Sequence, residues 1–218
     1  MASFRSDWAL PIALVALTIV PSGAGIVRLV EIGGGAEMTP ENARFFAGAT
    51  SATIHIVTAM VFGIFGAFQF AARFRRRNPE WHRRVGRVVA AAGLTAGLSG
   101  LWMTLTYPFA PGDGALLYYI RLVVGVAMVV SVVLGYIAIR RRDVTRHRAW
   151  MTRGYAIGMG AGTQVLINLP WVLLVEAHPG ETARALLLGA GWAINVVIAE
   201  WIIRAPPRRS AAAAGVTT

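Results

Sequence analysis

The sequence contains no cysteine, no lysine and few charged residues of any kind. Without cysteine the chain can form no disulfide scaffold, no thiolate metal site and no thiol nucleophile. Charged residues make up 14% of the chain, and hydrophobic residues make up 56%, whereas average soluble domains are about 25% charged. The mean hydropathy is +0.58. This balance excludes a disordered chain and an ordinary soluble domain, and it predicts a membrane protein with several spans.

Six apolar windows are long enough to cross a bilayer, which takes about 20 residues. Because backbone polar groups in lipid must bond within their own segment, each window predicts an α-helix. Stretches that contain glycine and proline follow the first, third and fifth windows. The sequence therefore predicts an all-α, polytopic membrane helix bundle with six transmembrane helices, at Trp8–Val30, Thr50–Ala72, Val85–Tyr107, Ala115–Ile139, Ala149–Val175 and Ala183–Ile203.

None of the loops between these windows is long enough for a second domain. We expect a single six-helix transmembrane domain over residues 1–209 and a disordered tail over residues 210–218, where small and polar residues dominate. The first window also has a feature of a signal peptide, because Ser22–Ala24 has a small-x-small form. Apolar residues continue over Ile26–Val30, so we expect a retained helix rather than a cleaved peptide.

All 21 basic residues are arginines, and the net charge is +11. Seven arginines lie within residues 73–87, around the connection of the second and third windows, and six lie within residues 140–153, around the connection of the fourth and fifth. Three more follow the sixth window and one precedes the first. The positive-inside rule then places this side, and both termini, in the cytoplasm. We expect a multi-pass protein of the bacterial cytoplasmic (inner) membrane. Its expected partners are the lipid bilayer and anionic lipid headgroups rather than nucleic acid, and the oligomeric state stays open.

The two arginine-rich loops resemble each other in sequence. Residues 75–83 and 140–148 align at an offset of 65, which pairs His82 with His147, and the same offset pairs Gly93 with Gly158. This predicts a duplicated helical hairpin, formed by spans two and three and again by spans four and five. The alternative is a chance similarity between two loops that are both rich in arginine.

The residues before the two histidines indicate where their helices begin. Asn78 and Asp143 are favourable N-cap residues, and Pro79 suits the first helical position. We therefore expect His82 and His147 in the first turns of helices that continue into the membrane, both near the cytoplasmic mouth of the bundle.

Several polar side chains fall inside the apolar windows, where such groups usually face other helices. For Gln164, Asn168 and Asn195 we expect hydrogen bonds between helices. For His55 a structural and a functional role are equally open. The candidate buried polar residues are His55, Gln69, Gln164, Asn168 and Asn195.

Two short patterns make the sequence similar to a known family. The first reads HR-x-x-GR and the second HR-x-WM-x-R. With His55 and Gln69 they resemble the DUF2306 family of predicted multi-pass bacterial membrane proteins, over about residues 55–175. The resemblance implies a membrane location and no assigned activity. The residues that carry the two patterns are His82, Arg83, Gly86, Arg87, His147, Arg148, Trp150, Met151 and Arg153.

Three functions fit the histidines and arginines. Arginine beside histidine is typical of anion recognition, which predicts a site at the cytoplasmic mouth that binds or moves an anionic small molecule or lipid headgroup. A second hypothesis is electron transfer through a b-type haem with His82 and His147 as axial ligands. A third is a structural or accessory membrane protein. Whether the protein is an enzyme stays open. The candidate ligand-binding residues are His82, Arg83, Arg87, His147, Arg148 and Arg153.

Overall fold

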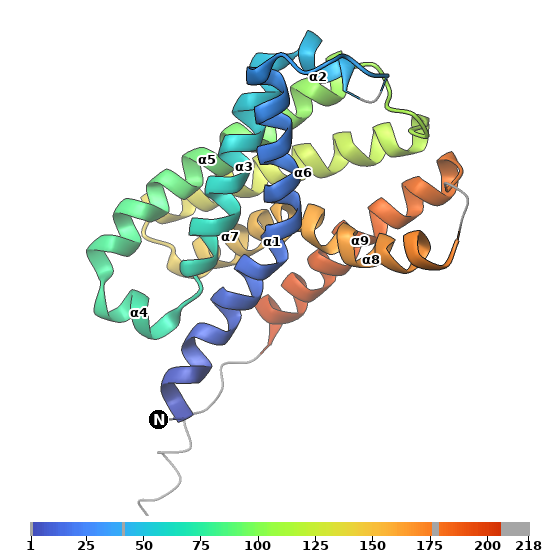
Figure 1. Ribbon diagram of the computed structural model, residues 1–218. Helices are drawn as coiled ribbons and strands as arrows, with labels where there is room; N and C mark the ends of the chain where they lie inside the picture. Colours follow the sequence, from blue (N-terminus) through green and yellow to red (C-terminus); the bar gives the residue numbers. More distant parts are fainter. Residues whose placement is uncertain (1, 41, 176–178, 206–218) are drawn as a thin grey trace, which may run out of the picture.

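The computed structural model describes residues 2–40, 42–175 and 179–205, with side chains from Trp8 onward. Every element within these residues is a helix, which confirms the all-α prediction (Figure 1). The elements are α1 (Ala2–Gly34), α2 (Ala43–Ala47), α3 (Ala49–Phe68), α4 (Ala72–Arg77), α5 (Pro79–Thr106), α6 (Ala115–Arg140), α7 (Val144–Gly158), α8 (Gly160–Leu174) and α9 (Glu181–Arg204).

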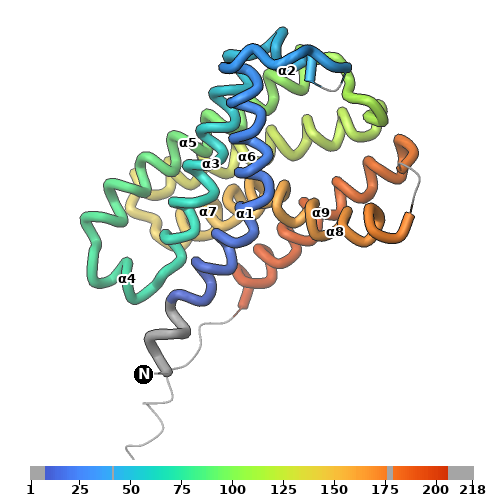
Figure 2. Tube along the Cα trace, viewed as in Figure 1, coloured from blue at the N-terminus to red at the C-terminus, as the bar shows by residue number. Residues whose placement is uncertain are grey.

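Five of these helices, α1, α3, α5, α6 and α9, are each long and apolar enough to cross a membrane. They coincide with five of the six predicted windows, and their ends differ from the predicted ends by a few residues. The fifth window differs from the prediction because it contains two helices. There α7 and α8 pass the same test only as a pair, and they are bent by 41° where they meet at Met159 (Figure 2).

The bend lies in a stretch where glycines allow unusually close packing. A Cβ atom at Gly160 would collide with the ring of Trp192 on α9, and one at Gly162 would collide with the backbone carbonyl of Leu17 on α1. The side chain of Asn195 donates a hydrogen bond of 3.0 Å to the carbonyl oxygen of Ala156 beside the bend. A neighbouring helix thus supplies hydrogen bonding that a broken helix loses in lipid.

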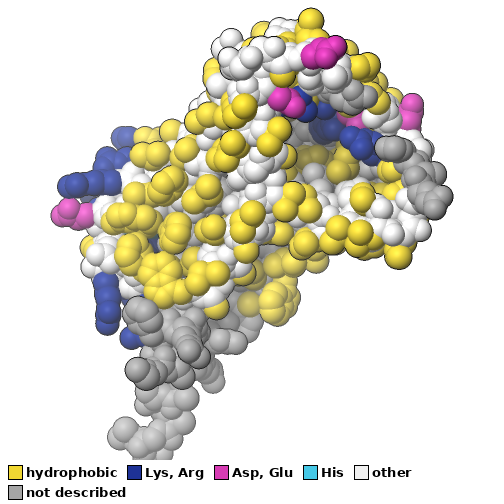
Figure 3. All heavy atoms as spheres, viewed as in Figure 1, with side chains coloured by type: hydrophobic (Ala, Val, Ile, Leu, Met, Phe, Trp, Pro, Cys, Tyr) yellow, Lys and Arg dark blue, Asp and Glu magenta, His cyan; other side chains and the backbone are white. Residues whose placement is uncertain are grey.

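The outside of the bundle is largely apolar. Among the exposed large hydrophobic side chains, Val27 on α1 is 58% exposed, Val123 on α6 69% and Val197 on α9 67%. Hydrophobic side chains cover most of the face shown in Figure 3. A soluble protein would bury such side chains, whereas a protein surrounded by lipid gains nothing by doing so.

Successive long helices run in opposite directions, so the α3–α5 and α6–α7 connections lie at one end of the bundle (Figure 1). The beginning of α1 and the end of α9 lie at the same end. We call it the arginine-rich end, because the two connections carry the arginines of residues 73–87 and 140–153. The loop of residues 107–114 and the helix α2 lie at the opposite end.

Two observations bear on the predicted duplication. The helices α5 and α7 begin at Pro79 and Val144, which are also 65 residues apart. The matched glycines Gly93 and Gly158 both pack against the ring of Phe62, where a Cβ atom would come within 2.6 Å of Phe62 at Gly158 and closer still at Gly93. The two hairpins differ beyond these positions, because α5 continues to Thr106 whereas α7 ends at Gly158.

Several predictions fall outside the described residues and stay predictions. They concern the 210–218 tail, the two arginines at 208 and 209, and the side chain of Arg5. The domain boundary at residue 209 lies there too.

Candidate functional site

The arginine-rich end brings His82 and His147 into equivalent helix positions. Each is the fourth residue of its helix, α5 or α7, so both lie in first turns as predicted. Asp143 caps α7, because its carboxylate accepts a hydrogen bond of 2.9 Å from the backbone N–H of Arg146. Asn78 precedes α5 without such a bond, and its amide donates instead to the carbonyl oxygen of Phe74.

The imidazole of His147 is oriented by a backbone group. Its Nδ1 lies 2.8 Å from the carbonyl oxygen of Gly135 on α6. Because a carbonyl oxygen can only accept, Nδ1 carries the proton in this bond. Within the described chain, Nε2 of His147 makes no hydrogen bond, so this nitrogen remains available to another group.

The most unusual feature of this end is a set of buried polar atoms without partners. Across the described residues, four side-chain nitrogen or oxygen atoms are buried and make no hydrogen bond. Three of them are Nε2 and Oε1 of Gln69, at the end of α3, and Nδ1 of His82, on α5. A Cβ atom at Gly86, one turn after His82, would lie 3.4 Å from Oε1 of Gln69. We call Gln69 and His82 the Gln69–His82 cluster.

The charges around this cluster are positive. Arg75 donates a hydrogen bond of 3.0 Å to the carbonyl oxygen of Gln69. The charges that act on His82 are those of Arg75, His147 and Arg83, and none of them is a carboxylate. Arg75 on α4, Arg83 on α5 and His147 on α7 are thus the charged neighbours of these unpaired polar atoms.

The predicted arginines of this end are exposed or have other partners. Arg83, Arg87 and Arg148 are exposed. Arg153 forms a bidentate ion pair with Glu200 on α9, with Nε–Oε1 and Nη2–Oε2 distances of 2.5 and 3.1 Å. Its guanidinium also lies over the ring of Trp150, 4.6 Å from the ring centroid. Arg153 thus joins α7 to α9.

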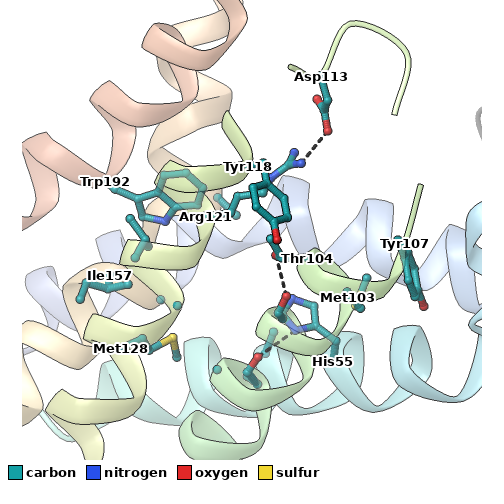
Figure 4. A pocket seen from close by; sticks show the side chains of 18 of the residues that line it. His55, Met103, Thr104, Tyr107, Asp113, Tyr118, Arg121, Met128, Ile157 and Trp192 are labelled. Atoms are coloured by element: carbon teal, nitrogen blue, oxygen red, sulfur yellow. Dashed lines mark hydrogen bonds and ion pairs between the residues drawn. The ribbon is translucent and has the colours of Figure 1, made fainter. Parts of the chain in front are cut away.

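A cavity of about 350 Å³ lies toward the opposite end, between α3, α5, α6, α7 and α9. Phe62, Met128, Ile157 and Trp192 form its apolar interior, and Figure 4 shows the last three around it. Its size is in the range of small-molecule sites in proteins. None of the sequence patterns had indicated this cavity.

At the mouth of the cavity, Asp113 forms ion pairs with two helices. It lies in the 107–114 loop, and its side chain is 2% exposed. Its Oδ2 lies 2.5 Å from Nη1 of Arg121 on α6, and its Oδ1 lies 2.8 Å from Nε of Arg184 on α9 (Figure 4 shows the first pair). Burial raises the pKa of Asp113, but the hydrogen bonds from Arg184 and Arg121 outweigh it and hold the pKa below its ordinary value. Asp113 is therefore a carboxylate that joins two helices.

Arg44, at the same mouth, lacks such a partner. Its Nε is the fourth buried atom without a hydrogen bond, and Arg44 forms no ion pair with any residue that the structure describes. Burial lowers the pKa of Arg44 from its usual value, but an arginine remains charged in proteins. Among the described residues, Arg44 is therefore a cation of this rim without a counter-ion.

His55 lies in the wall of this cavity. Its Nδ1 is 3.0 Å from the carbonyl oxygen of Ala96 and 3.2 Å from Oγ of Ser99, both on α5. The carbonyl again requires the proton on Nδ1, so Nε2 is the acceptor nitrogen of the neutral ring. Within the described residues, no three histidine, aspartate or glutamate side chains lie together as a metal site would need.

Most of the residues described above lie within a region that matches a known protein family. A family described as "Predicted membrane protein (DUF2306)" matches residues 52–203. The chain belongs to the DUF2306 family. No curated protein and no solved structure matches the chain. The DUF2306 match begins on α3 and ends on α9, so it includes the Gln69–His82 cluster and most of the cavity but not Arg44.

Of the remaining polar residues of this DUF2306 protein, Gln164 and Asn195 join helices, whereas Asn168 does not. Gln164 on α8 donates to the carbonyl oxygen of Leu188 on α9 at 2.8 Å. Asn195 accepts a hydrogen bond of 2.8 Å from Thr163 and donates to the backbone of α7. Asn168 donates to the carbonyl oxygen of Gln164 within its own helix.

Three charged residues on the side that carries few arginines are the sequence feature that could have indicated the cavity. Arg121 and Arg184 lie on the side that carries few arginines, where the positive-inside rule gives no reason for them. Asp113 precedes both in the chain, in a loop with Pro111 and Gly112. The contact between the three residues depends on how α6 and α9 pack, which sequence spacing does not reveal.

Proposed function

We propose that the arginine-rich end of this membrane protein binds an anionic small molecule or a lipid headgroup at the Gln69–His82 cluster. The observation that supports the proposal is the three buried polar atoms of the cluster that have no partner among the described residues. A buried polar atom without a hydrogen bond costs about 1–3 kcal/mol. A bound group that pairs these atoms gains this energy in addition to its own contacts.

The donor and acceptor atoms of the cluster indicate which chemical groups a ligand must carry. The Gln69 amide nitrogen donates, and Nδ1 of His82 donates when it is protonated, so both suit phosphate or carboxylate oxygens. The Gln69 amide oxygen accepts, so it suits a hydroxyl of the same ligand. Arg75, Arg83 and His147 add the positive charge. A phosphoryl group that also carries a hydroxyl, such as hydrogen phosphate or a glycerol phosphate headgroup, offers both functions.

Calorimetric titration of the purified protein in nanodiscs of neutral lipid tests this proposal, with inorganic phosphate as the probe. A second arm uses nanodiscs that contain phosphatidylglycerol, which separates a lipid headgroup from a free anion. We expect Gln69→Leu and His82→Leu to weaken binding of the preferred probe at least tenfold. Arg84→Gln is the matched control, because Arg84 is exposed at the same end and pairs with Glu80. Equal affinities in all variants would contradict the proposal.

A specific observation also supports the haem hypothesis. His82 and His147 lie on neighbouring helices within electrostatic range of each other. The bond from Nδ1 of His147 to Gly135 leaves Nε2 available, and such a bond fixes the ring of a metal-ligating histidine. This function predicts a Soret band after expression with added haem, lost in His82→Ala and in His147→Ala but kept in His55→Ala. A wild-type protein without the band would exclude it.

We also propose that the arginine-rich end faces the cytoplasm of a bacterial inner membrane, which rests on the arginine distribution. The absence of cysteine allows a direct test with single introduced thiols. Pro111→Cys and Thr145→Cys lie at opposite ends of the bundle, and both positions are exposed. In intact cells, a membrane-impermeant maleimide is expected to label Pro111→Cys only, and the reverse pattern would contradict this orientation.

A further inference from the structure

The cavity at the opposite end is separate from the Gln69–His82 cluster and has two chemically different parts. Phe62, Val124, Met128, Ile157 and Trp192 line its interior. Arg44, Asp113 and Arg121 line its mouth. A site with an apolar interior and a cationic rim suits a ligand that has an apolar chain and an anionic head.

Among the described residues, the arginines of the rim carry more positive charge than the nearby carboxylates neutralise. The arginines that act on Arg44 are Arg28, Arg121 and Arg184, and Asp113 is the carboxylate that acts on it. Asp113 is already shared by Arg121 and Arg184. Arg28 pairs with Glu31, and the Glu181 carboxylate lies beside Gly114.

Arg44 is thus the arginine of this rim without an ion-pair partner among the described residues, and its Nε is buried without a hydrogen bond. Its guanidinium lies over the ring of Phe45, 4.7 Å from the ring centroid, which keeps it at the mouth. Arg44 is half-buried, and a cation that is partly removed from water without a partner is costly. An anion at this position would remove that cost.

The cavity is open on the side where α6 and α9 diverge. In Figure 3 this face is hollowed, and arginine side chains lie inside the hollow. The lining residues come from α6 on one side and from Ala161 and Trp192 on the other. The outside of both helices is apolar. A chain-like molecule dissolved in the lipid can therefore approach the cavity from the side, along the apolar outside of α6 and α9.

We propose that this cavity binds a single-chain anionic amphiphile, such as a fatty acid, taken up from the surrounding lipid. The carboxylate pairs with Arg44 and, beside Asp113, with Arg121, and the hydrocarbon chain lies along Phe62, Met128 and Trp192. The site is independent of the proposed anion site at the arginine-rich end, since the two share no residue.

Quenching of Trp192 tests the proposal, because this ring lines the cavity. Brominated stearate added to the protein in neutral-lipid nanodiscs is expected to quench a saturable part of the tryptophan fluorescence. Trp192→Phe is expected to remove this saturable part. Oleate is expected to compete with the probe, whereas oleyl alcohol, which has the same chain without the charge, is expected to compete at least tenfold less well.

Further variants distinguish the contribution of the Arg44 charge from that of the apolar space in the cavity. Arg44→Gln is expected to weaken oleate binding about tenfold, the size of one lost charged hydrogen bond. Arg28→Gln, at the same end but paired with Glu31 and outside the lining of the cavity, is the control and is expected to change the affinity much less. Val124→Phe fills the apolar part and abolishes saturable quenching, although every charge remains.

The proposal is overturned if wild-type quenching does not saturate, if oleyl alcohol competes as well as oleate, or if Arg44→Gln and Arg28→Gln behave alike. Gln69→Leu distinguishes the two sites, because it is expected to leave oleate binding unchanged.

Discussion

Replacing Gln69 by leucine is expected to stabilise the ligand-free protein while abolishing its response to the anion. Leucine has a similar size and removes two buried amide atoms that have no partner among the described residues. Each such atom costs about 1–3 kcal/mol when unpaired, and ordered water recovers part of this cost. We therefore expect the free energy of unfolding to rise by about 1–3 kcal/mol.

The assay is thermal unfolding of the protein in neutral-lipid nanodiscs, with and without phosphate. A gain of 1 kcal/mol shifts the midpoint by roughly 2–4 °C in a chain of this length. Phosphate at about one hundred times its dissociation constant stabilises the wild type by about 2.7 kcal/mol. The Gln69→Leu protein is expected to start from a higher midpoint and to show none of this further shift.

Gln164→Leu is the matched control, because it is the same substitution at another glutamine of an apolar helix. Gln164 is paired, and its loss leaves the carbonyl oxygen of Leu188 without that donor. A bond of this kind between membrane helices is worth about 0.6 kcal/mol on average, so Gln164→Leu is expected to lower stability and to keep the response to phosphate. If Gln69→Leu lowers stability as well and still responds to phosphate, the reasoning is refuted.

Three other predictions concern packing and charge. Gly162→Ala is expected to cost several kcal/mol in thermal unfolding, because its Cβ would collide with the backbone of Leu17, whereas Gly23→Ala, with open space around it, is expected to be neutral. Tyr155→Phe is expected to lower stability by about 0.5–1.5 kcal/mol, since the hydroxyl donates a buried hydrogen bond of 2.7 Å to α3. Because the pKa of Asp113 is lower in the folded protein, its stabilising contribution is present above its unfolded pKa of about 3.9 and is lost as the pH falls through the folded value. A melting curve series is therefore expected to fall in acid for the wild type and to be flatter for Asp113→Asn.

Hydropathy predicted the fold well, because crossing a bilayer demands a long apolar run whatever the neighbouring helices do. Hydropathy did not predict the bend at Met159, since α7 and α8 together read as one apolar span. The glycines at 160 and 162 mark the place in the sequence. Their close contacts with Trp192 and Leu17, which are far away in the chain, form only on folding.

The candidate site could be predicted in part. The 65-residue offset placed His82 and His147 at one end, and Gln69 was recognised as a polar residue in an apolar helix. The sequence did not reveal that Arg153 pairs with Glu200, because helix α9 comes to α7 only through folding. The cavity was missed for the same reason, since its lining comes from seven helices, α2, α3 and α5–α9, and from the 107–114 loop.

The central claim is that the Gln69–His82 cluster pairs its buried polar atoms with an anion. An experimental density map of the protein in neutral-lipid nanodiscs, recorded with and without phosphate, tests it most directly. We predict a phosphate-dependent feature within hydrogen-bonding distance of the Gln69 amide nitrogen and Nδ1 of His82. A map in which these atoms bond to each other or to other protein groups, unchanged by phosphate, would contradict the claim.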